Sequence, residues 1–418
     1  MPRLILIVSK RAYNADAFVA AARAAGADVT LATDRCHQLD AVWGGDSLVL
    51  DYRDTEAAAQ RAAELARPLS PAAVLGTDDH TAAIASRTAE LLGLPGNAAR
   101  AARDAANKLE SRTVLAAAGV PVPAFFAVPL DGDVAAAAAR APYPCVLKPL
   151  ALSASRGVIR ADGPAAFAEA FARIRRLVRS PEVASRGPEG QDALLVEAFV
   201  PGPEVALEGL MDRGALRVLA LFDKPDPLDG PFFEETLYVT PSRLDAFTQR
   251  EIARVVESGA RALGLVDGPV HAELRVSPSG PVVLEIAART VGGLCGRTLR
   301  FGAGVSLEEL VVRHALGEHG PLLARERRPA GVMMLPIPRS GTLLGYAGVE
   351  AAKAVPGVED VVVTAQVGAP LVPLPEGDSY LGFAFARGDT PEAVERSLRA
   401  AAAKLTFDIA TRLPLAAR

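Results

Sequence analysis

The stretch from residue 268 to residue 288 restricts the fold more than any other part of the chain. Residues 270–277 alternate between apolar and polar side chains, which is the two-residue period of a strand with one buried face. A second apolar run at 281–287 follows Pro278-Ser279-Gly280, and proline first with glycine last suits a three-residue hairpin loop. We therefore predict an antiparallel β-hairpin with those three residues as its loop.

In that register, the apolar residues of the two strands face one another, and Glu273 lies opposite Glu285 on the other face. His271 and Arg275 share the face of the two acids. Like charges directly opposite are destabilising, and a bound Mg²⁺ would compensate them, since this hard cation takes carboxylate oxygens. The alternative is a solvated polar face on which Arg275 screens both acids, and the hairpin alone favours neither interpretation.

Two features beyond the hairpin favour the metal site. Arg289 follows the second predicted strand, and Gly292-Gly293 comes shortly after it. A cation and a flexible backbone beside an acidic pair are typical of a site for an anionic substrate. We therefore expect this region to bind a negatively charged molecule.

A second candidate site begins at Lys148, which ends an apolar strand and precedes Pro149. In the following loop, residues 152–158, small side chains would let backbone amides wrap a phosphate, with Ser153 and Ser155 as further donors. The Walker A pattern is absent, and turns of this composition are common, so the loop alone is a weak signal. A lysine at a strand end is also frequently a cap whose ammonium reaches solvent.

The connector from Glu197 to Glu204 joins two further predicted strands. Its free backbone groups could read the edge of an adenine, and Glu204 could accept hydrogen bonds from ribose hydroxyls. The alternative is an ordinary connection with exposed acids, and the connector by itself favours that alternative.

Composition limits the partners of the chain. A net charge of −4 and an isoelectric point near 5.9 argue against nucleic acid, though not against a phosphate ligand. The three cysteines, Cys36, Cys145 and Cys295, lie far apart without CxxC or Cys/His spacing, so we expect no zinc site and a reducing cytoplasm. Since no uncharged apolar run reaches about 20 residues, we expect a soluble protein without a membrane span.

The order of predicted elements indicates three sections. Residues 1–105 alternate strands with alanine-rich helices, which predicts a doubly wound α/β domain with a parallel sheet. Residues 106–318 are α+β, and residues 319–418 form a small C-terminal α+β domain. The predicted strands are Leu4–Val8, Asp28–Leu31, Ser47–Leu50, Ala73–Leu75, Pro142–Pro149, Ala193–Phe199, Glu204–Met211, Val332–Ile337, Val358–Gln366 and Phe383–Arg387. The predicted helices are Asn14–Ala25, Glu56–Ala66, one that runs to Leu92 with Asp78 as its cap, Ala165–Val178, Leu244–Leu263, and Pro391–Ala402 with Thr390 as its cap.

Taken in order, the motifs resemble the ATP-grasp superfamily, and within it the L-amino acid ligases that make dipeptides. Each motif is weak, but their order and spacing agree over roughly residues 1–415. The resemblance implies an ATP-grasp fold whose central domain, 106–318, carries a flap subdomain at about 122–200. The motifs are Asn107-Lys108, Lys148-Pro149 with its loop, Glu197 to Glu204, His271-Ala272-Glu273, and Glu285 to Arg289 with Gly292-Gly293.

The resemblance also implies ATP and Mg²⁺, with the phosphates held by two lysines and a mobile flap, and the base and ribose held by the connector. The residues that would bind ATP are Lys108, Lys148, Ser153, Ser155, Gly157, Glu197, Phe199 and Glu204. The metal would be bound by Glu273 and Glu285. The residues that would contact the substrates are Glu235, Tyr238, Arg289, Gly292 and Gly293.

In the implied reaction, a small carboxylate attacks the γ-phosphate of ATP, and an amine then displaces phosphate from the acyl phosphate. Lys148 and Arg289 would be catalytic, and Glu235 would meet an amino group. Two positions depart from the family, since Ala287 replaces a common Asn ligand and Tyr238 replaces a His of the dipeptide ligases. The alternatives are bicarbonate activation of the biotin carboxylase kind, a nucleotide-pathway ligase, or a non-catalytic ATP-binding protein. A homodimer is a family expectation.

Overall fold

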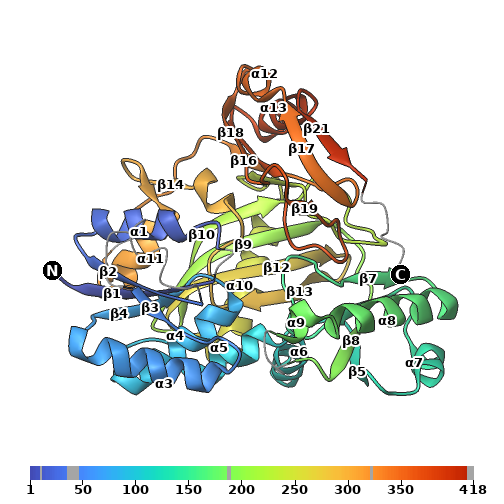
Figure 1. Cartoon of the computed structure of the whole chain (residues 1–418), viewed down its shortest axis with the longest axis horizontal. Coiled ribbons are helices and arrows are strands. Elements are labelled where there is room, and N and C mark those ends of the chain that lie inside the picture. The colour runs from blue at the N-terminus through green and yellow to red at the C-terminus, as the bar shows by residue number, and fades with distance from the viewer. Residues whose placement is uncertain (10–11, 35–46, 186–189, 321–322, 412–418) are drawn as a thin grey trace.

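The computed structural model describes residues 1–9, 12–34, 47–185, 190–320 and 323–411. Figure 1 shows three groups of elements around a central sheet, with the N-terminal group in blue, the flap region in green and the C-terminal group in orange and red. Among the described residues, no helix is long and apolar enough to cross a membrane.

The N-terminal sheet is parallel throughout, in the order β3-β2-β1-β4. Leu4 to Val8 of its strand β1 are at most 1% exposed, as expected where helices cover both faces. Asp78 and Thr81 form a reciprocal capping box at the start of α4. The predicted doubly wound fold is confirmed. The elements are β1 (Arg3–Val8), α1 (Ala15–Ala24), β2 (Asp28–Thr33), β3 (Ser47–Val49), α3 (Thr55–Ala66), η2 (Arg67–Leu69), β4 (Ala73–Gly76), α4 (Asp79–Leu92), α5 (Ala99–Ala106) and α6 (Lys108–Ala117).

The flap region contains an antiparallel sheet in the order β5-β8-β6-β7. Helix α8 packs on this sheet through Phe167, Phe171 and Ile174, which are at most 1% exposed. The strands predicted near 142–149 and 193–199 are confirmed. The elements are β5 (Phe125–Pro129), α7 (Val134–Arg140), β6 (Cys145–Pro149), β7 (Ile159–Ala161), α8 (Pro164–Val178), α9 (Pro181–Ala184) and β8 (Ala193–Ala198).

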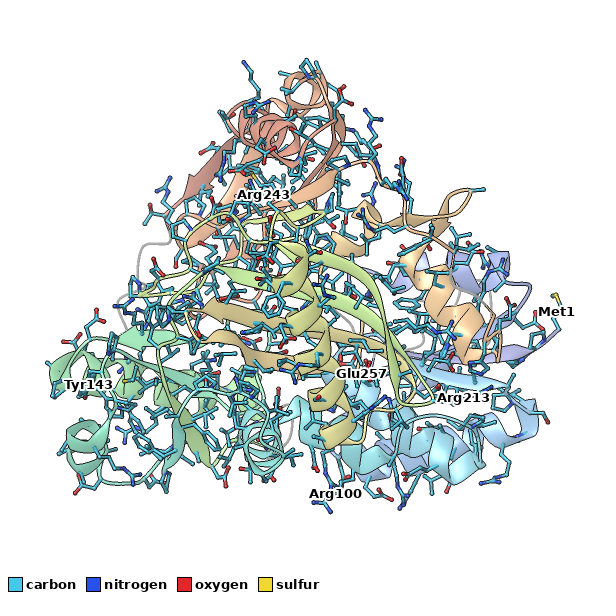
Figure 2. All side chains as sticks on the ribbon, turned by 180° about the vertical axis from the view of Figure 1, so that it is seen from behind. Met1, Arg100, Tyr143, Arg213, Arg243 and Glu257 are labelled. Carbon is cyan, nitrogen blue, oxygen red and sulfur yellow. The ribbon has the colours of Figure 1, made fainter. Side chains whose placement is uncertain are left out.

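The central sheet has eight strands in the order β13-β12-β9-β10-β11-β16-β20-β18. Helix α10 crosses its rear face, as seen in Figure 2, where Glu257 of that helix is labelled. Gly259 permits this approach, because a Cβ there would lie 2.5 Å from Ile286 Cδ1 of β13. The elements from 204 to 287 are β9 (Glu204–Asp212), β10 (Ala215–Asp223), β11 (Leu237–Thr240), α10 (Ala246–Leu263), β12 (Gly268–Ser277) and β13 (Gly280–Ala287).

The section after residue 319 does not fold apart from the central sheet. Its strands β16, β20 and β18 extend the central sheet beyond β11, so that sheet crosses the expected domain boundary. A second, three-stranded sheet, β19-β17-β21, lies beyond them. The remaining elements are η3 (Cys295–Thr298), β14 (Arg300–Phe301), β15 (Val305–Ser306), α11 (Leu307–Ala315), β16 (Ala330–Leu335), β17 (Gly341–Ala347), α12 (Val349–Lys353), β18 (Val358–Val363), β19 (Pro370–Leu371), β20 (Gly382–Arg387), α13 (Pro391–Ala402) and β21 (Thr406–Ala410).

Candidate active site

The hairpin β12–β13 forms as expected, but its turn differs from the prediction. Ser277 pairs with Gly280, so Pro278 and Ser279 alone make a two-residue loop, and the predicted three-residue loop is wrong. Gly280 has a φ of 115°, a left-handed conformation that favours glycine. The tip of the hairpin is therefore one residue out of step with the predicted register.

A β-bulge restores the predicted register at the two acids. Leu274 pairs with Val283, whereas Glu273 pairs with Glu285, so Leu284 is the extra residue of its strand. The carbonyl oxygen of Leu284 accepts a hydrogen bond from the buried guanidinium of Arg112. The bulge thus satisfies its unpaired backbone group, and the predicted pairing of Glu273 with Glu285 is confirmed.

The two acids have different cationic neighbours. Glu273 lies 3.3 Å from Lys224 Nζ and 3.3 Å from His271 Nε2. Glu285 lies 3.3 Å from the Arg289 guanidinium and 3.9 Å from Lys108 Nζ. The alternative in which Arg275 screens both acids is not what the structure shows.

Arg275 instead turns to Glu204, with its Nε 3.1 Å from the carboxylate. It also donates to the carbonyl oxygen of Val200 at 3.1 Å. Glu204 is 8% exposed, so the alternative of an exposed acid in the connector does not hold. The carboxylate expected to meet a ribose is therefore already paired with a buried arginine.

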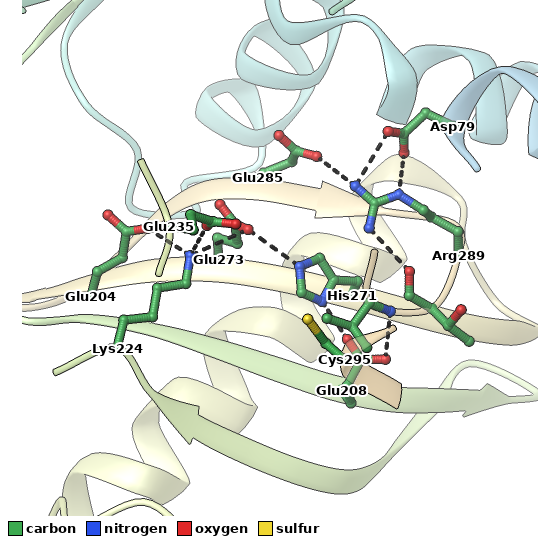
Figure 3. A network of polar contacts seen from close by, with 12 residues as sticks. Asp79, Glu204, Glu208, Lys224, Glu235, His271, Glu273, Glu285, Arg289 and Cys295 are labelled. Atoms are coloured by element: carbon green, nitrogen blue, oxygen red, sulfur yellow. Dashed lines mark hydrogen bonds and ion pairs between the residues drawn. The ribbon is translucent and has the colours of Figure 1, made fainter. Parts of the chain in front are cut away.

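Lys224, which the sequence analysis did not single out, lies at the centre of an acidic cluster (Figure 3). Its ammonium contacts Glu235, and it lies 2.8 Å from Glu204 and 3.3 Å from Glu273. Burial lowers the pKa of Lys224, but the three carboxylates outweigh it and raise the pKa well above its usual value. Burial and the charge of Glu273 raise the pKa of Glu235 to about 7, against the pull of Lys224.

Tyr238, the second residue of β11, borders this cluster. It is 2% exposed, and its ring centroid lies 5.0 Å from Lys224 Nζ. A cation near the face of an aromatic ring is attracted by the ring quadrupole. The tyrosine expected to contact substrate thus also supports the lysine.

His271 connects the cluster to the interior of the sheet. Its Nδ1 contacts Glu208, which is fully buried and also accepts from the N–H of Val291 at 3.1 Å. Burial lowers the pKa of His271, but the charge and hydrogen bond of Glu208, with the bond to Glu273, outweigh it and raise the pKa to about 9. The imidazolium therefore links two carboxylates.

Arg289 joins the hairpin to the N-terminal domain. Its guanidinium binds Asp79, the first residue of α4, with Nε 2.9 Å from Oδ1. It also donates to the carbonyl oxygen of Thr290 at 3.1 Å. Burial lowers the pKa of Arg289, but Asp79 and Glu285 outweigh it and raise the pKa, so the guanidinium stays charged.

Lys148 is buried rather than snorkelling into solvent, since it is 9% exposed. Its ammonium lies 2.5 Å from Glu197, which is 1% exposed and also contacts Arg112. Burial raises the pKa of Glu197, but the two cations outweigh it and lower the pKa. Glu197 was expected to meet adenine, and in the structure its carboxylate is held inside this buried trio.

The backbone near Phe199 was also expected to meet adenine. The Phe199 N–H donates to the Pro144 carbonyl oxygen at 2.8 Å, so this amide is already used. Two guanidinium groups lie near the Phe199 ring, with Arg160 and Arg275 at 4.3 and 4.9 Å from the ring centroid. The ring therefore has two cations as neighbours.

The loop at 152–158 takes an unusual backbone conformation. Ala154 and Ser155 have φ values of 56° and 54°, which non-glycine residues rarely adopt and which cluster at functional sites. Lys108 reaches the start of the loop and donates to the Leu152 carbonyl oxygen at 2.7 Å. Ser153 and Ser155 both line the cleft that the candidate site residues share.

The same loop is fastened to the C-terminal section by Arg156. This arginine is 5% exposed, lies 3.0 Å from Glu182 and 3.5 Å from Asp378, and donates to the Glu376 carbonyl oxygen at 2.7 Å. The N–H of Gly157 donates to the Pro375 carbonyl oxygen at 2.7 Å. The Gly157 amide is therefore used by the C-terminal section, and Gly157 itself lies outside the cleft lining.

The predicted site residues otherwise converge on one cleft of about 2140 Å³. It is bordered by the N-terminal domain, the flap, the central sheet and the C-terminal section. The predicted residues that line it are Lys108, Lys148, Ser153, Ser155, Glu197, Phe199, Glu204, Glu235, Tyr238, Glu273, Glu285, Arg289, Gly292 and Gly293.

Comparison with known proteins finds separate family matches in the central and the C-terminal sections of the chain. A model of the ATP-grasp domain matches residues 141–298, and a model of the L-amino acid ligase C-terminal domain 2 matches residues 333–410. The crystal structure of an L-amino acid ligase from Bacillus licheniformis superposes with a TM-score of 0.79 at 25% identity, covering 98% of this chain and 99% of that chain.

Two curated relatives are similar over shorter stretches. The uncharacterized protein y4rH of Sinorhizobium fredii is 30% identical over 316 residues, covering 76% of this chain and 64% of that protein. The alanine–anticapsin ligase of Bacillus subtilis is 25% identical over 240 residues, covering 54% of this chain and 50% of that ligase. The matched part of this chain thus spans about half to two thirds of the length of these relatives.

Proposed function

This chain belongs to the ATP-grasp superfamily, and from that membership we propose that it is an ATP-dependent ligase that joins a carboxylate to an amine. The product would be an amide or a peptide, with an amino acid as one substrate, and ADP and phosphate would be released. The observation that carries the proposal is the convergence of Lys148, Glu273, Glu285 and Arg289 on one cleft from three different strands and the loop after them.

In the proposed reaction, a carboxylate oxygen of the first substrate attacks the γ-phosphorus of ATP, and the bond to the β-γ bridging oxygen breaks. Lys148 and Arg289 neutralise the charge that develops on the transferred group. The amine then attacks the acyl carbon, the carbon–phosphate oxygen bond breaks, and the amine loses a proton. This route needs no side-chain nucleophile.

We assign Glu273 and Glu285 to the binding of one Mg²⁺. The donors fit this ion, because two carboxylates stand opposite one another and oxygen ligands are what Mg²⁺ takes. Oxygens of Glu204, Glu235 and Glu273 also lie within 4.8 Å of one another. The ion, when bound, would neutralise phosphate charge. Ala287 offers no side-chain oxygen, which is why the proposal is limited to one ion.

The flap would exclude water from the acyl phosphate. The support for this role is that Arg156 contacts both Glu182 of the flap region and Asp378 of the C-terminal section. Water that reached the intermediate would hydrolyse it and waste the ATP. We therefore treat Arg156 as a residue that positions the flap rather than as a catalytic one.

We propose that Glu235 receives the amino group of a substrate. The support is that the cluster around it already accommodates an ammonium, that of Lys224. A second ammonium would be shared among three carboxylates, so Lys224 would also set how much negative charge is left for the substrate.

We propose domain boundaries at residues 105 and 318, and the central sheet extends across the second boundary.

The test is a screen in which pairs of carboxylates and amines are mixed with ATP, Mg²⁺ and the full chain. We expect ADP and phosphate release that depends on both substrates, with an amide product seen by mass spectrometry. Glu285→Ala should abolish that release. Turnover with bicarbonate and no amine would instead support carboxylation, and tight ATP binding without turnover on any pair would reject an enzymatic role.

A further inference from the structure

Two histidines and an aspartate come together away from the cleft. Asp267 lies in the connection before β12, His314 is in the last turn of α11, and His319 follows that helix. Ligand atoms of all three lie within 4.8 Å of one another. His314 Nε2 is 3.0 Å from Asp267 Oδ1, and the two histidine rings meet edge to face with 4.7 Å between their centroids. None of the three is part of the cleft lining described above.

The end of α11 folds so that His319 returns to His314. Gly317 has a φ of 90°, the left-handed conformation that closes many helix C-termini. Its N–H donates to the His314 carbonyl oxygen at 2.9 Å, and the next N–H, that of Glu318, donates to the Arg313 carbonyl oxygen at 2.9 Å. In the sequence, His314 and His319 have a His-x4-His spacing, which lies within the range found for zinc-binding histidine pairs.

Asp267 is held in place from the N-terminal domain. The side chain of Asn97 accepts from the Asp267 N–H at 3.0 Å and donates to the Asp267 carbonyl oxygen at 2.7 Å. Both backbone groups of Asp267 are thus used by Asn97, and its carboxylate points to His314. The cluster is therefore built from fixed elements, since helix α11 positions one side and this anchored connection the other.

A second observation concerns Asp212, at the end of β9. Asp212 is 9% exposed, and its Oδ2 binds Arg217. Its Oδ1 is buried, lacks a hydrogen bond from the described residues, and lies 3.5 Å from His319 Nδ1. An unsatisfied buried acceptor is costly, and metal-bound histidines commonly donate their second ring N–H to a carboxylate. Arg213, labelled in Figure 2 in the turn between β9 and β10, has its Nε 4.0 Å from the same oxygen, which is too far for a hydrogen bond.

We propose that Asp267, His314 and His319 bind a divalent transition-metal ion of the Zn²⁺ type, with Asp212 orienting His319. Imidazole and carboxylate are established zinc ligands, and three protein ligands leave a fourth position for water. The C-terminal end of α11 adds the negative end of a helix dipole, which favours a cation. The site departs from the expectation of no zinc site, which considered cysteine spacing and not a histidine pair with an aspartate.

The experiment uses the full chain after chelator treatment, in the absence of ATP. Calorimetric titration with Zn²⁺ should show one tight equivalent, and Co²⁺ should give visible absorption bands of a tetrahedral site. His319→Ala should abolish both signals, and Asp212→Asn should weaken binding by about 10–100-fold. Glu318→Ala, a change of the neighbouring exposed acid, should leave binding intact.

Two further variants separate the proposal from other outcomes. Glu273→Gln should keep the tight equivalent, and its loss there would move the binding site to the cleft and overturn the proposal. His319→Cys should retain Co²⁺ and add an intense thiolate charge-transfer band, a gain of signal that misfolding does not produce. Absence of tight binding to the unaltered chain, or equal binding by His319→Ala, would also overturn the proposal.

Discussion

Arg289 Nε lies 2.9 Å from Asp79 Oδ1, although 210 positions separate the two residues in the chain. Asp79 begins α4 of the N-terminal domain, and Arg289 follows β13 of the central sheet. The same guanidinium lies 3.3 Å from Glu285. An acid of the N-terminal domain therefore orients the arginine that we propose holds the transferred phosphoryl group.

Replacing Asp79 with Asn should reduce kcat/KM for ligation while the protein stays folded. Hydrogen bonds to charged groups are worth about 1.5–3 kcal/mol, so we expect a decrease of about 10–100-fold. Steady-state ADP release at varied carboxylate concentration measures it. Glu90→Gln, an exposed change on the same helix, is the matched control, and an unchanged kcat/KM in Asp79→Asn would reject the orienting role.

Replacing Lys224 with Met should destabilise the protein, because three carboxylates would lose their shared ammonium. Removing one partner of a buried ion pair costs about 3–5 kcal/mol. Urea unfolding should show this loss, and Mg²⁺ should restore more stability to the variant than it adds to the unaltered chain. Lys353→Met removes an exposed lysine and serves as the control. Equal stability of Lys224→Met and the unaltered chain would count against the cluster.

Replacing Arg156 with Ala should uncouple ATP use from product formation. The flap would lose its contacts with Glu182, Asp378 and the Glu376 carbonyl group, and water would reach the intermediate. We expect phosphate release to exceed amide formation, which parallel phosphate and mass-spectrometric assays detect. Arg179→Ala, at an exposed ion pair on the same subdomain, should stay coupled. Full coupling in Arg156→Ala would contradict this role.

The stability of the protein should depend on pH through His271. Its folded-state pKa is about 9, above the usual value of 6.5, so its contribution is fully present below about pH 6.5 and is lost as the pH rises through 9. Urea unfolding at several pH values, compared between the unaltered chain and His271→Gln, isolates this contribution. The stability difference between the two should shrink from pH 6 to pH 10. A difference that stayed constant would mean that the imidazole is not charged in the folded state.

The pattern of apolar residues was sufficient to predict those elements that follow one consistent period. The alternating residues of β12 and the continuous apolar run of β1 both folded as predicted, and Asp78 and Thr390 cap the helices they were expected to cap. Strand β10 was missed, because its first half is largely solvent-exposed and its second half is buried, so it shows neither period. The hairpin loop was misjudged because a bulge, invisible in the pattern, compensates a shorter turn.

The candidate site was predicted as a set of residues but not as a set of contacts. Motif order brought Lys148, Glu197 and Glu273 to attention, yet their counter-ion Arg112 carries no local signal beyond its residue type. Lys224 stands one residue after an apolar run and precedes a proline, which is close to the setting of Lys148, and that similarity could have identified it. Long-range pairs such as Arg289 with Asp79 depend on how the domains pack, which periodicity does not reveal.

The central sheet brings residues from two different sections of the chain to the same cleft. Tyr238 of β11 pairs with Val332 of β16, and Met334 and Tyr380 beside them also line the cleft. The side of the cleft that faces Glu235 is therefore formed partly by the C-terminal section, which contributes no proposed metal ligand. Exchanging residues 330–411 with those of a relative would thus alter which molecules are joined while the phosphoryl chemistry stays with the recipient chain.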